Sequence, residues 1–458
     1  MRNLTEGSET KEIILFALPM LIGNVFQQFY NMVDSIVVGQ FVGKRALAAV
    51  GAGFPVLFLM LALIMGVTMG STILIAQFFG AKDKEKVRAT VDTAYITLFW
   101  AGLGISVIGF VCVPWILAVL RVPETVAADA SAYLRVLFAG SLATFGYNAV
   151  AAILRGLGDS KTPLYLLAAA TLLNIGLDIL FVVAFGWGVI GVAWATVIAQ
   201  GFSFLGALVL LNTRNEYVSL DVRNLHFDPP LFRLSLKLGI PSGIQQTLVA
   251  LGMMVLTRIV NTFGTDTMAA YTAAGRLDSF AMMPSMNLSQ AVSTFVGQNL
   301  GAGKPERVRR GYASALLIGI AISVAISAIV MILGPALMGI FTSDPEVVRI
   351  GSRYLFIVGS FYILFSVMFI NNGVVRGAGD VMIPMANTLL AMWLIRIPAA
   401  YFLSSFLGSD GIWWSIPSGW LVGAVFSSWY YRTGRWKRKA IVRNPVKPET
   451  QTVEAELP

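Results

Sequence analysis

Four polar residues lie within otherwise apolar stretches and have side chains suited to binding a proton or a small hard cation. Asp34 lies in the first such stretch, Asn174 and Asp178 lie in the fifth, and Thr196 lies in the sixth. Asn174 and Asp178 are four residues apart, which places them on one face of a helix. Two carboxylates, an amide and a hydroxyl form an oxygen-rich set suited to H⁺ or Na⁺. Neighbouring carboxylates would also ionise as a coupled pair.

The segments that carry these residues have the composition of membrane-spanning helices. The chain is 57% hydrophobic and 12% charged, against about 25% charged residues in soluble domains. Charge-free runs exceed the roughly 20 residues that cross a bilayer, at 46–81, 93–120, 179–213 and 311–343. These runs are continuously apolar rather than alternating, which favours helices over a β-barrel.

We therefore predict an all-α integral membrane protein with twelve transmembrane helices, near residues 13–38, 47–79, 90–114, 132–154, 163–185, 189–211, 234–260, 268–298, 311–335, 353–375, 384–405 and 413–431. Counted from the outer helix ends, Asp34, Asp178 and Thr196 each lie about 8 to 10 Å deep at about 1.5 Å per residue. A charge at the membrane centre costs about 2.5 to 3.5 kcal/mol. We interpret the acids as cation-coupling groups, and the alternative is a static polar network with neighbouring helices.

The distribution of basic residues predicts the orientation. If both termini lie on one side, the loops and tails of that side carry 23 of the 33 Lys and Arg, those of the other side carry four, and six fall within the helix ranges. The positive-inside rule then places both termini in the cytoplasm. This accounts for the net charge of +9 without nucleic acid as a partner.

Few residues are available for redox or metal chemistry. The chain has one cysteine, Cys112, and one histidine, His226. An intramolecular disulfide is therefore excluded and no metal site is expected beyond Na⁺ at the acids. The first residues lack the pattern of a cleaved signal peptide, so we expect the first helix to be retained. No cofactor is predicted apart from the coupling ion.

The chain contains an internal duplication. Arg-Gly-Leu-Gly-Asp at 155–159 recurs as Arg-Gly-Ala-Gly-Asp at 376–380, an offset of 221 residues (376 − 155). The segments that begin at Gln77 and Gln298 match at the same offset, as do Tyr133 and Tyr354. Each copy contains six predicted helices, an even number, so the two repeats are parallel. The predicted units are an N-terminal lobe at 1–211, a cytoplasmic linker at 212–233, a C-terminal lobe at 234–435 and a polar cytoplasmic tail at 436–458.

The two copies differ in their acids. The positions that match Asp34, Asn174 and Asp178 are occupied in the second copy by apolar residues, which are Val255 or Leu256, Ile395 and Ala399. A carboxylate that the six-helix unit needed for folding should occur in both copies. We therefore predict that the N-terminal lobe is the coupling half.

The second copy has its own candidates for substrate contact or gating: Arg258, Arg276, Asp278, Met282, Met286 and Arg396. Arg276 and Asp278 are interpreted first as a structural ion pair, with substrate contact as the alternative. Arg396 lies near the middle of the eleventh helix, where gating or packing would explain it. Flexible methionines suit a surface that accepts many apolar ligands, and they equally suit gap-filling in a helix bundle.

Two glycine motifs are interpreted as turns. Residues 186–191 satisfy the dinucleotide pattern Gly-x-Gly-x-x-Gly but follow no strand, so a tight hairpin between helices is expected. The Gly-x-Gly-Asp repeats lie at cytoplasmic helix ends, where Gly can stop one helix and Asp can cap the next. We expect no protease or other enzyme activity, since no nucleophile, metal site or acid pair occupies matching positions.

The chain resembles bacterial multidrug and toxic compound extrusion (MATE) transporters over about 13–435. The resemblance is carried by Ala-Leu-Pro at 17–19 followed by Asp34, by the matched segments 77–81 and 298–302, by both Arg-Gly-x-Gly-Asp repeats and by Arg-Ile-Pro at 396–398. It implies a two-lobed exporter that exchanges H⁺ or Na⁺ for organic, often cationic and amphipathic, compounds.

Within that family the chain looks like the DinF-like branch. That resemblance maps an N-lobe cation site onto Asp34, Asn174, Asp178 and Thr196. The seventh helix lacks the acidic residue of the NorM-like branch, and its charges are Lys237 near the cytoplasmic end and Arg258. The expected protein is a monomeric secondary exporter whose partners are small organic substrates and membrane lipids. The alternative is a flippase for a lipid-linked precursor, which would need a basic cavity built from Arg258, Arg276 and Arg396.

Overall fold

The computed structural model describes residues 2–214 and 223–442, and over these ranges it contains helices, turns and loops but no strands. The elements in chain order are α1 (Glu9–Val37), η1 (Val38–Val42), α2 (Lys44–Gly80), α3 (Lys84–Val119), α4 (Glu124–Ala139), α5 (Ser141–Gly156), α6 (Lys161–Asp178), η2 (Ile179–Ala184), α7 (Gly188–Arg214), α8 (Pro229–Asn261), α9 (Thr265–Gly301), α10 (Pro305–Gly339), α11 (Pro345–Gly359), α12 (Tyr362–Gly377), α13 (Met382–Thr388), η3 (Leu389–Arg396), α14 (Ile397–Leu407), α15 (Ser409–Thr433) and η4 (Arg435–Lys439).

Eight helices in the described ranges are long and apolar enough to cross a membrane, and two bent helix pairs bring the number to ten. α9 and α15, with 37 and 25 residues, also exceed the roughly 20 residues of a span but are more polar. The predicted all-α membrane architecture is confirmed. The fourth and tenth predicted helices are not single rods, because α4 meets α5 at 48° and α11 meets α12 at 49°.

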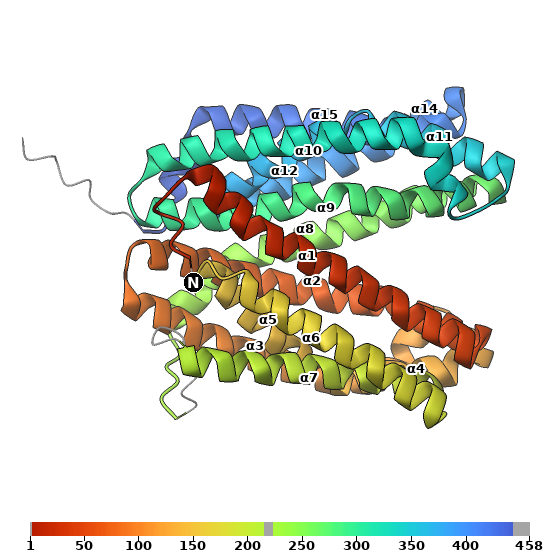
Figure 1. Cartoon of the computed structure of the whole chain (residues 1–458), viewed down its shortest axis with the longest axis horizontal. Helices are drawn as coiled ribbons and strands as arrows, with labels where there is room; N and C mark the ends of the chain where they lie inside the picture. Colours follow the sequence, from red (N-terminus) through yellow and green to blue (C-terminus); the bar gives the residue numbers. More distant parts are fainter. Residues whose placement is uncertain (1, 215–222, 443–458) are drawn as a thin grey trace, which may run out of the picture.

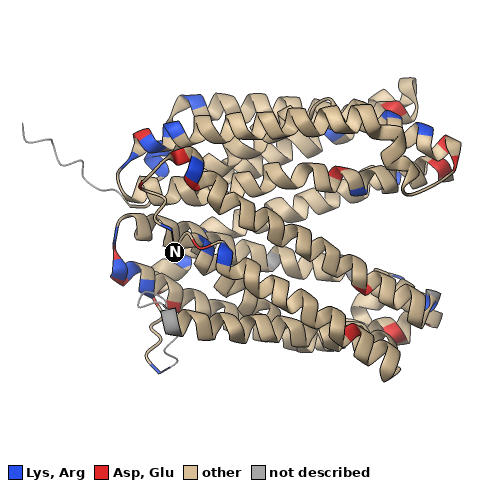
Figure 2. Ribbon diagram, viewed as in Figure 1, with Lys and Arg blue, Asp and Glu red and all other residues tan. Residues whose placement is uncertain are grey.

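The helices form two lobes that lie side by side (Figure 1). The first lobe, here the N-lobe, contains α1 to α7, and the second, the C-lobe, contains α8 to α15. Lys and Arg residues gather at the end of the molecule where the chain begins (Figure 2). We call this the basic end. It contains the loops after α2, α5, α9 and α12, and from it the lobes lean apart toward the opposite end.

Close backbone packing joins the lobes toward the basic end. α2 packs along α8 and α9, and α1 crosses from α6 of its own lobe to α9 and α10 of the other. A Cβ atom built on Gly70 would lie 2.0 Å from the carbonyl oxygen of Ser235, and one on Gly239 would lie 2.2 Å from that of Gly66. Only glycine permits this approach, since no Cβ is tolerated at such distances. α2 and α8 are thereby held nearly in backbone contact.

The predicted linker and tail are shorter than expected. α7 continues to Arg214, and α8 already begins at Pro229, where the Asp228 carboxylate accepts a hydrogen bond from the Leu231 backbone N–H at 2.9 Å. Residues 215–222 lie outside the described residues. The segment 436–442, which the sequence assigns to a polar tail, is packed: Trp436 is buried, and Ile441 contacts the apolar core around α2 and α5. Residues 443–458 also lie outside the described residues.

Three membrane helices contain a π-helical segment that the sequence did not predict. η1 begins four residues after Asp34, η2 directly follows Asp178, and η3 ends at Arg396. A π segment widens the helix by one residue per turn and is frequent at functional sites. Each interruption therefore lies next to a charged residue within the membrane.

Candidate functional site

The structure brings Asp34 of α1 and Asp178 of α6 into contact within the N-lobe. Their carboxyl groups lie within hydrogen-bonding reach of each other. In the amide orientation that satisfies its neighbours, Nδ2 of Asn174 lies 3.0 Å from Oδ1 of Asp34 and 3.3 Å from Oδ2 of Asp178. Asn174 and Asp178 are fully buried. The three residues form one polar cluster: Asn174 and Asp178 share a helix face, and Asp34 meets them from α1 at the same depth.

Two tyrosines that the sequence analysis did not identify complete this cluster. Tyr30 lies one helical turn before Asp34, and its hydroxyl lies against Thr196 of α7. Tyr133 of α4 lies within electrostatic reach of both acids. Both rings are buried. The four-residue spacing to Asp34 could have identified Tyr30, and the repeat-matched Tyr354 could have drawn attention to Tyr133.

Three buried oxygen atoms of this cluster make no hydrogen bond of ordinary geometry with the described residues: Tyr30 OH, Asp178 Oδ1 and Thr196 Oγ1. The Tyr30 and Thr196 hydroxyls lie against each other, so Asp178 Oδ1 is the atom that lacks a neighbour to bond. An unsatisfied buried polar atom costs about 1 to 3 kcal/mol, which points to a missing partner at this carboxylate. Hydroxyl and carboxylate oxygens are ligands for a hard cation or acceptors for a proton. The donor set therefore fits the predicted H⁺ or Na⁺ site. Within 2–214 and 223–442, no group of three or more His, Cys, Asp or Glu side chains could hold another kind of metal ion.

The C-lobe holds a separate buried carboxylate at Asp278 of α9. Its Oδ1 accepts a hydrogen bond from the Tyr362 hydroxyl at 2.6 Å, and its Oδ2 accepts one from the Tyr354 hydroxyl at 3.0 Å. Tyr354 is the repeat counterpart of Tyr133 (354 − 133 = 221). Each lobe thus places the same tyrosine beside a carboxylate, but the acid comes from a different helix.

The predicted ion pair between Arg276 and Asp278 is wrong. Asp278 is buried and bonded to tyrosines, whereas Arg276 is exposed, and the described residues show no ion pair between them. The physical reason is that residues two apart on a helix do not face each other. The structure instead places Arg396, at the end of η3, within electrostatic reach of Asp278. Arg396 is half-buried and donates to the Met392 sulfur at 3.8 Å, so it belongs to the C-lobe interior.

The remaining C-lobe candidates are not gathered into one site. Met282 packs against the C-lobe core, which is the gap-filling role, while Met286 on the same helix is 44% exposed. Arg258 is exposed in the last turn of α8. Met286 and Arg258 therefore stay candidates for substrate contact.

The two glycine motifs are turns. Gly186 and Gly188 have φ of 69° and 57°, a conformation that favours glycine, and Trp187 donates its N–H to the Phe181 carbonyl at 2.9 Å. In the first Gly-x-Gly-Asp motif, Asp159 caps α6 by accepting from the N–H of Lys161 and of Thr162, each at 3.0 Å. The cap predicted for the second motif is wrong, because the buried Asp380 accepts from the Tyr430 hydroxyl instead.

This difference predicts unequal effects of the same substitution. Asp159→Ala is expected to lower the free energy of unfolding by about 1 kcal/mol, the usual cost of a lost helix cap. Asp380→Ala is expected to cost about 2 kcal/mol, because the Tyr430 hydroxyl loses its acceptor in a largely buried place. Unfolding in detergent measures both, with exposed Asp129→Ala as the control within about 0.5 kcal/mol of the parent. A smaller loss for Asp380→Ala than for Asp159→Ala would contradict this assignment.

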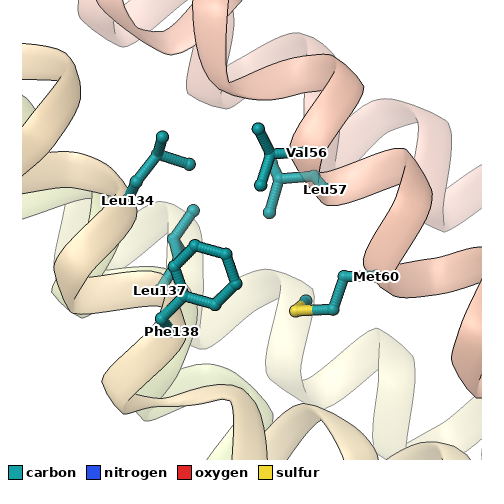
Figure 3. A pocket seen from close by; sticks show the side chains of 6 residues that line it. All are labelled: Val56, Leu57, Met60, Leu134, Leu137 and Phe138. Atoms are coloured by element: carbon teal, nitrogen blue, oxygen red, sulfur yellow. The ribbon is translucent and has the colours of Figure 1, made fainter. Parts of the chain in front are cut away.

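Two pockets lie away from the polar cluster. One is a narrow apolar gap between α2 and α4, where Val56, Leu57 and Met60 face Leu134, Leu137 and Phe138 (Figure 3). It lacks a polar side chain to orient a ligand. The other, of about 400 Å³, lies between α12 and α15 and ends at Arg432. Neither contains a residue of the acid cluster.

Both the sequence and the fold are similar to those of known proteins. The family model described as MatE matches residues 19–180 and 241–402. The two matched segments begin 222 residues apart (241 − 19), which agrees with the duplication. The chain is 33% identical over 448 residues to the probable multidrug resistance protein YoeA of Bacillus subtilis (strain 168), covering 96% of each. It is 32% identical over 438 residues to the probable multidrug resistance protein YpnP of the same organism, covering 95% of this chain and 97% of the relative.

A solved structure with the same architecture is described as the outward-facing conformation of a multidrug resistance MATE family transporter of the MOP superfamily. It superposes with a TM-score of 0.89 at 26% identity, covering 95% of this chain and 98% of that chain. The likeness extends over both lobes, so the whole architecture is shared.

Proposed function

This chain belongs to the MATE family, and from that premise we propose that it is a multidrug exporter that exchanges H⁺ or Na⁺ for organic compounds, cationic or amphipathic in character. The observation that carries the proposal is the contact between Asp34 and Asp178, which Asn174 bridges and where Asp178 Oδ1 has no hydrogen-bond partner among the described residues. Its position in the N-lobe agrees with the DinF-like branch that the sequence resembles. No cofactor beyond the coupling ion is needed, and a monomer contains both lobes.

The coupling ion would act by changing the charge of the acid cluster. Two carboxylates in contact repel each other when both are ionised, so the pair favours a bound proton or cation between them. α1 connects this charge to the lobe interface. Its far half contributes Tyr30 and Asp34, while Asn24 at its middle donates to Asn287 of the C-lobe at 2.8 Å. A change in ion occupancy can therefore alter how α1 packs between the lobes.

We assign the basic end to the cytoplasm, following the positive-inside rule, in the inner membrane of a bacterium. The lobes are in contact at this end and lean apart at the other (Figure 1). The structure would then be open to the outside, like the outward-facing relative. Substrate would be released from this state and ion would enter it, after which closure of the outer end would return the ion to the cytoplasm.

Export by cells tests this proposal. Bacteria that produce the protein are expected to accumulate less of a fluorescent organic cation such as ethidium than cells with an empty vector. The difference should disappear when a protonophore, together with removal of external Na⁺, abolishes both ion gradients. Equal accumulation with and without the protein, across several organic cations, would count against the multidrug exporter.

The alternative function is translocation of a lipid-linked precursor, which needs cationic groups for a pyrophosphate head group. Arg396 lies near Asp278 inside the C-lobe, while Arg258 and Arg276 are exposed on other helices, so the three cations do not gather around one head group. This arrangement supports the exporter over the flippase. Ion-independent transfer of a fluorescent lipid pyrophosphate between leaflets of reconstituted vesicles, without export of organic cations, would favour the flippase.

A further inference from the structure

We propose that Gln77 and Gln298 are the locking residues of the gate at the basic end, and that the chain segments 2–8 and 440–442 are straps that complete the lock. The proposal deepens the proposed function, because it rests on the two lobes alternately closing at opposite ends. It assigns the closed side of that cycle to a defined set of reciprocal contacts.

Each of the two glutamines donates a hydrogen bond from its side-chain amide to a glycine carbonyl in the opposite lobe. Nε2 of Gln77 in the N-lobe donates to the carbonyl oxygen of Gly377 in the C-lobe at 3.0 Å. Nε2 of Gln298 in the C-lobe donates to the carbonyl oxygen of Gly156 in the N-lobe, also at 3.0 Å. The pairs are related by the repeat offset, since 298 − 77 and 377 − 156 both equal 221. Both glutamine side chains are fully buried.

The backbones beside the glutamines touch. A Cβ atom built on Gly80 would lie 1.9 Å from the carbonyl oxygen of Gln298, and one on Gly301 would lie 1.9 Å from that of Gln77. These distances leave no room for any side chain, and the obstacle is backbone that cannot rotate away. Gly80 and Gly301 are therefore required for the lobes to close at this end.

Each glutamine also holds a strap that arrives from the other lobe. The strap before α1 brings the N–H of Leu4 to Oε1 of Gln298 at 3.1 Å, and the side chain of Leu4 is buried in the C-lobe core. The strap after α15 brings the N–H of Ile441 to Oε1 of Gln77 at 2.8 Å. The strap at 2–8 leads into the N-lobe and binds the C-lobe, whereas the strap at 440–442 follows the C-lobe and binds the N-lobe.

The Gly-x-Gly-Asp repeats seat these straps. Gly158 and Gly379, which match at the repeat offset, have φ of 80° and 97°. A Cβ atom on Gly158 would lie 2.3 Å from the carbonyl oxygen of Arg2, and one on Gly379 would lie 3.1 Å from that of Lys439. The repeated motif thus has a role beyond ending a helix: in each lobe it supports one glutamine contact and one strap.

The lock is suited to opening and closing. All of its hydrogen bonds cross between lobes or straps, so they break together when the lobes separate at this end. Because the separated amides and carbonyls would face water, the bonds lost on opening are replaced by bonds to water and the net change for each is small. The lock can therefore stabilise the state that is closed at the basic end without preventing the state that is open there.

Distance measurements between the basic ends of the lobes test the proposal without relying on transport. Arg88 of α3 and Arg309 of α10 are exposed repeat counterparts, and spin labels on Arg88→Cys and Arg309→Cys in a Cys112→Ser background report on the gate. The parent is expected to show mainly one short distance. Gly80→Ala and Gly301→Ala are expected to convert it to a longer distance.

The matched controls are Gly51→Ala in α2 and Gly275→Ala in α9, where a Cβ atom meets nothing within 4 Å. Gln77→Ala and Gln298→Ala are expected to raise the ratio of long to short distances about tenfold, the effect of leaving buried groups unpaired. Their control is Gln245→Ala, since Gln245 donates to Thr388 within the C-lobe at 2.8 Å.

The strap after α15 is tested by Ile441→Pro, which lacks the N–H that bonds to Gln77. This variant should raise the ratio of long to short distances, as Gln77→Ala does.

Unchanged distances in folded Gly80→Ala and Gly301→Ala would overturn the proposal, as would an equal effect of the control glycines. Where a glycine variant does not fold, the glutamine variants decide: a distance distribution equal to that of Gln245→Ala would also overturn it. The test is separate from the exporter assignment. Shifted distances in a protein that exports no organic cation would support the lock and reject the exporter, while normal export with unshifted distances would do the opposite.

Discussion

Replacing Asp34 with asparagine is expected to abolish ion-coupled export and to leave a folded protein. The substitution removes the charge that a coupling ion must neutralise, while the amide keeps nearly the same size and can still bond to Asn174 and Asp178. It also relieves repulsion between two adjacent carboxylates, so the free energy of unfolding should not fall. Asp178→Asn is expected to behave in the same way, because the two acids act as one coupled site.

Efflux from proteoliposomes and thermal unfolding in detergent measure the two properties separately. The control is Asp129→Asn, which changes an exposed carboxylate of α4 in the same lobe and should affect neither. Gradient-driven export by both Asp34→Asn and Asp178→Asn at the parent rate would remove the acids from the mechanism. They would then belong to a static polar network.

At Asp278, the buried carboxylate of the C-lobe, we expect substitution to reduce stability and to leave ion-coupled export intact. Asp278→Ala should lower the free energy of unfolding by about 3 kcal/mol, because it removes the acceptor of two buried tyrosine hydroxyls and leaves a cavity. Asp278→Asn should cost less, since its amide oxygen still accepts one of the two bonds and its shape is preserved. Ion-coupled export per folded molecule should persist in both variants.

The comparison of Asp278 with Asp34 separates the roles of the two lobes. Thermal unfolding and efflux, each normalised to folded protein, are measured for both positions in one preparation. Tyr362→Phe is a matched control at the C-lobe site: it removes one donor to Asp278 and should destabilise less than Asp278→Ala. Loss of coupling in Asp278→Asn at unchanged stability would place a second coupling group in the C-lobe.

Much of this architecture was predictable because it follows from simple periodicities. Long apolar runs predict spanning helices, and the 221-residue offset predicts two similar lobes. The cluster of Asp34, Asn174 and Asp178 was predictable since acids are costly in a membrane and helical spacing places Asn174 and Asp178 on one face. These are properties of the chain that do not depend on how the lobes pack.

Other features depend on tertiary contacts and could not be predicted in the same way. Tyr30 and Tyr133 are ordinary residues in an apolar helix until the fold brings them to the acids. The π segments depend on local backbone packing and have no sequence signature. The strap at 440–442 could not be predicted because it directly follows a cluster of basic residues, and a basic composition is typical of a solvated tail. The wrong pairing of Arg276 with Asp278 was avoidable, because a two-residue spacing separates the side chains on a helix.

The duplication explains the likeness of the lobes, and the asymmetry explains their division of labour. Tyr133 and Tyr354 occupy matching places, yet Tyr133 borders two acids, one of which has an unpartnered oxygen, and Tyr354 bonds to a single carboxylate whose two oxygens are both hydrogen-bonded. The contacts at the basic end are symmetric, whereas the acids are not. Gating is therefore assigned to both copies and ion coupling to the first.

Efflux of an organic cation from proteoliposomes, under a pH gradient and a Na⁺ gradient imposed separately, tests the central claim most directly. The account predicts that at least one gradient drives efflux by the parent protein and that neither drives efflux by Asp34→Asn. Efflux by the parent that is indifferent to both gradients, or driven efflux that survives in Asp34→Asn, would contradict it.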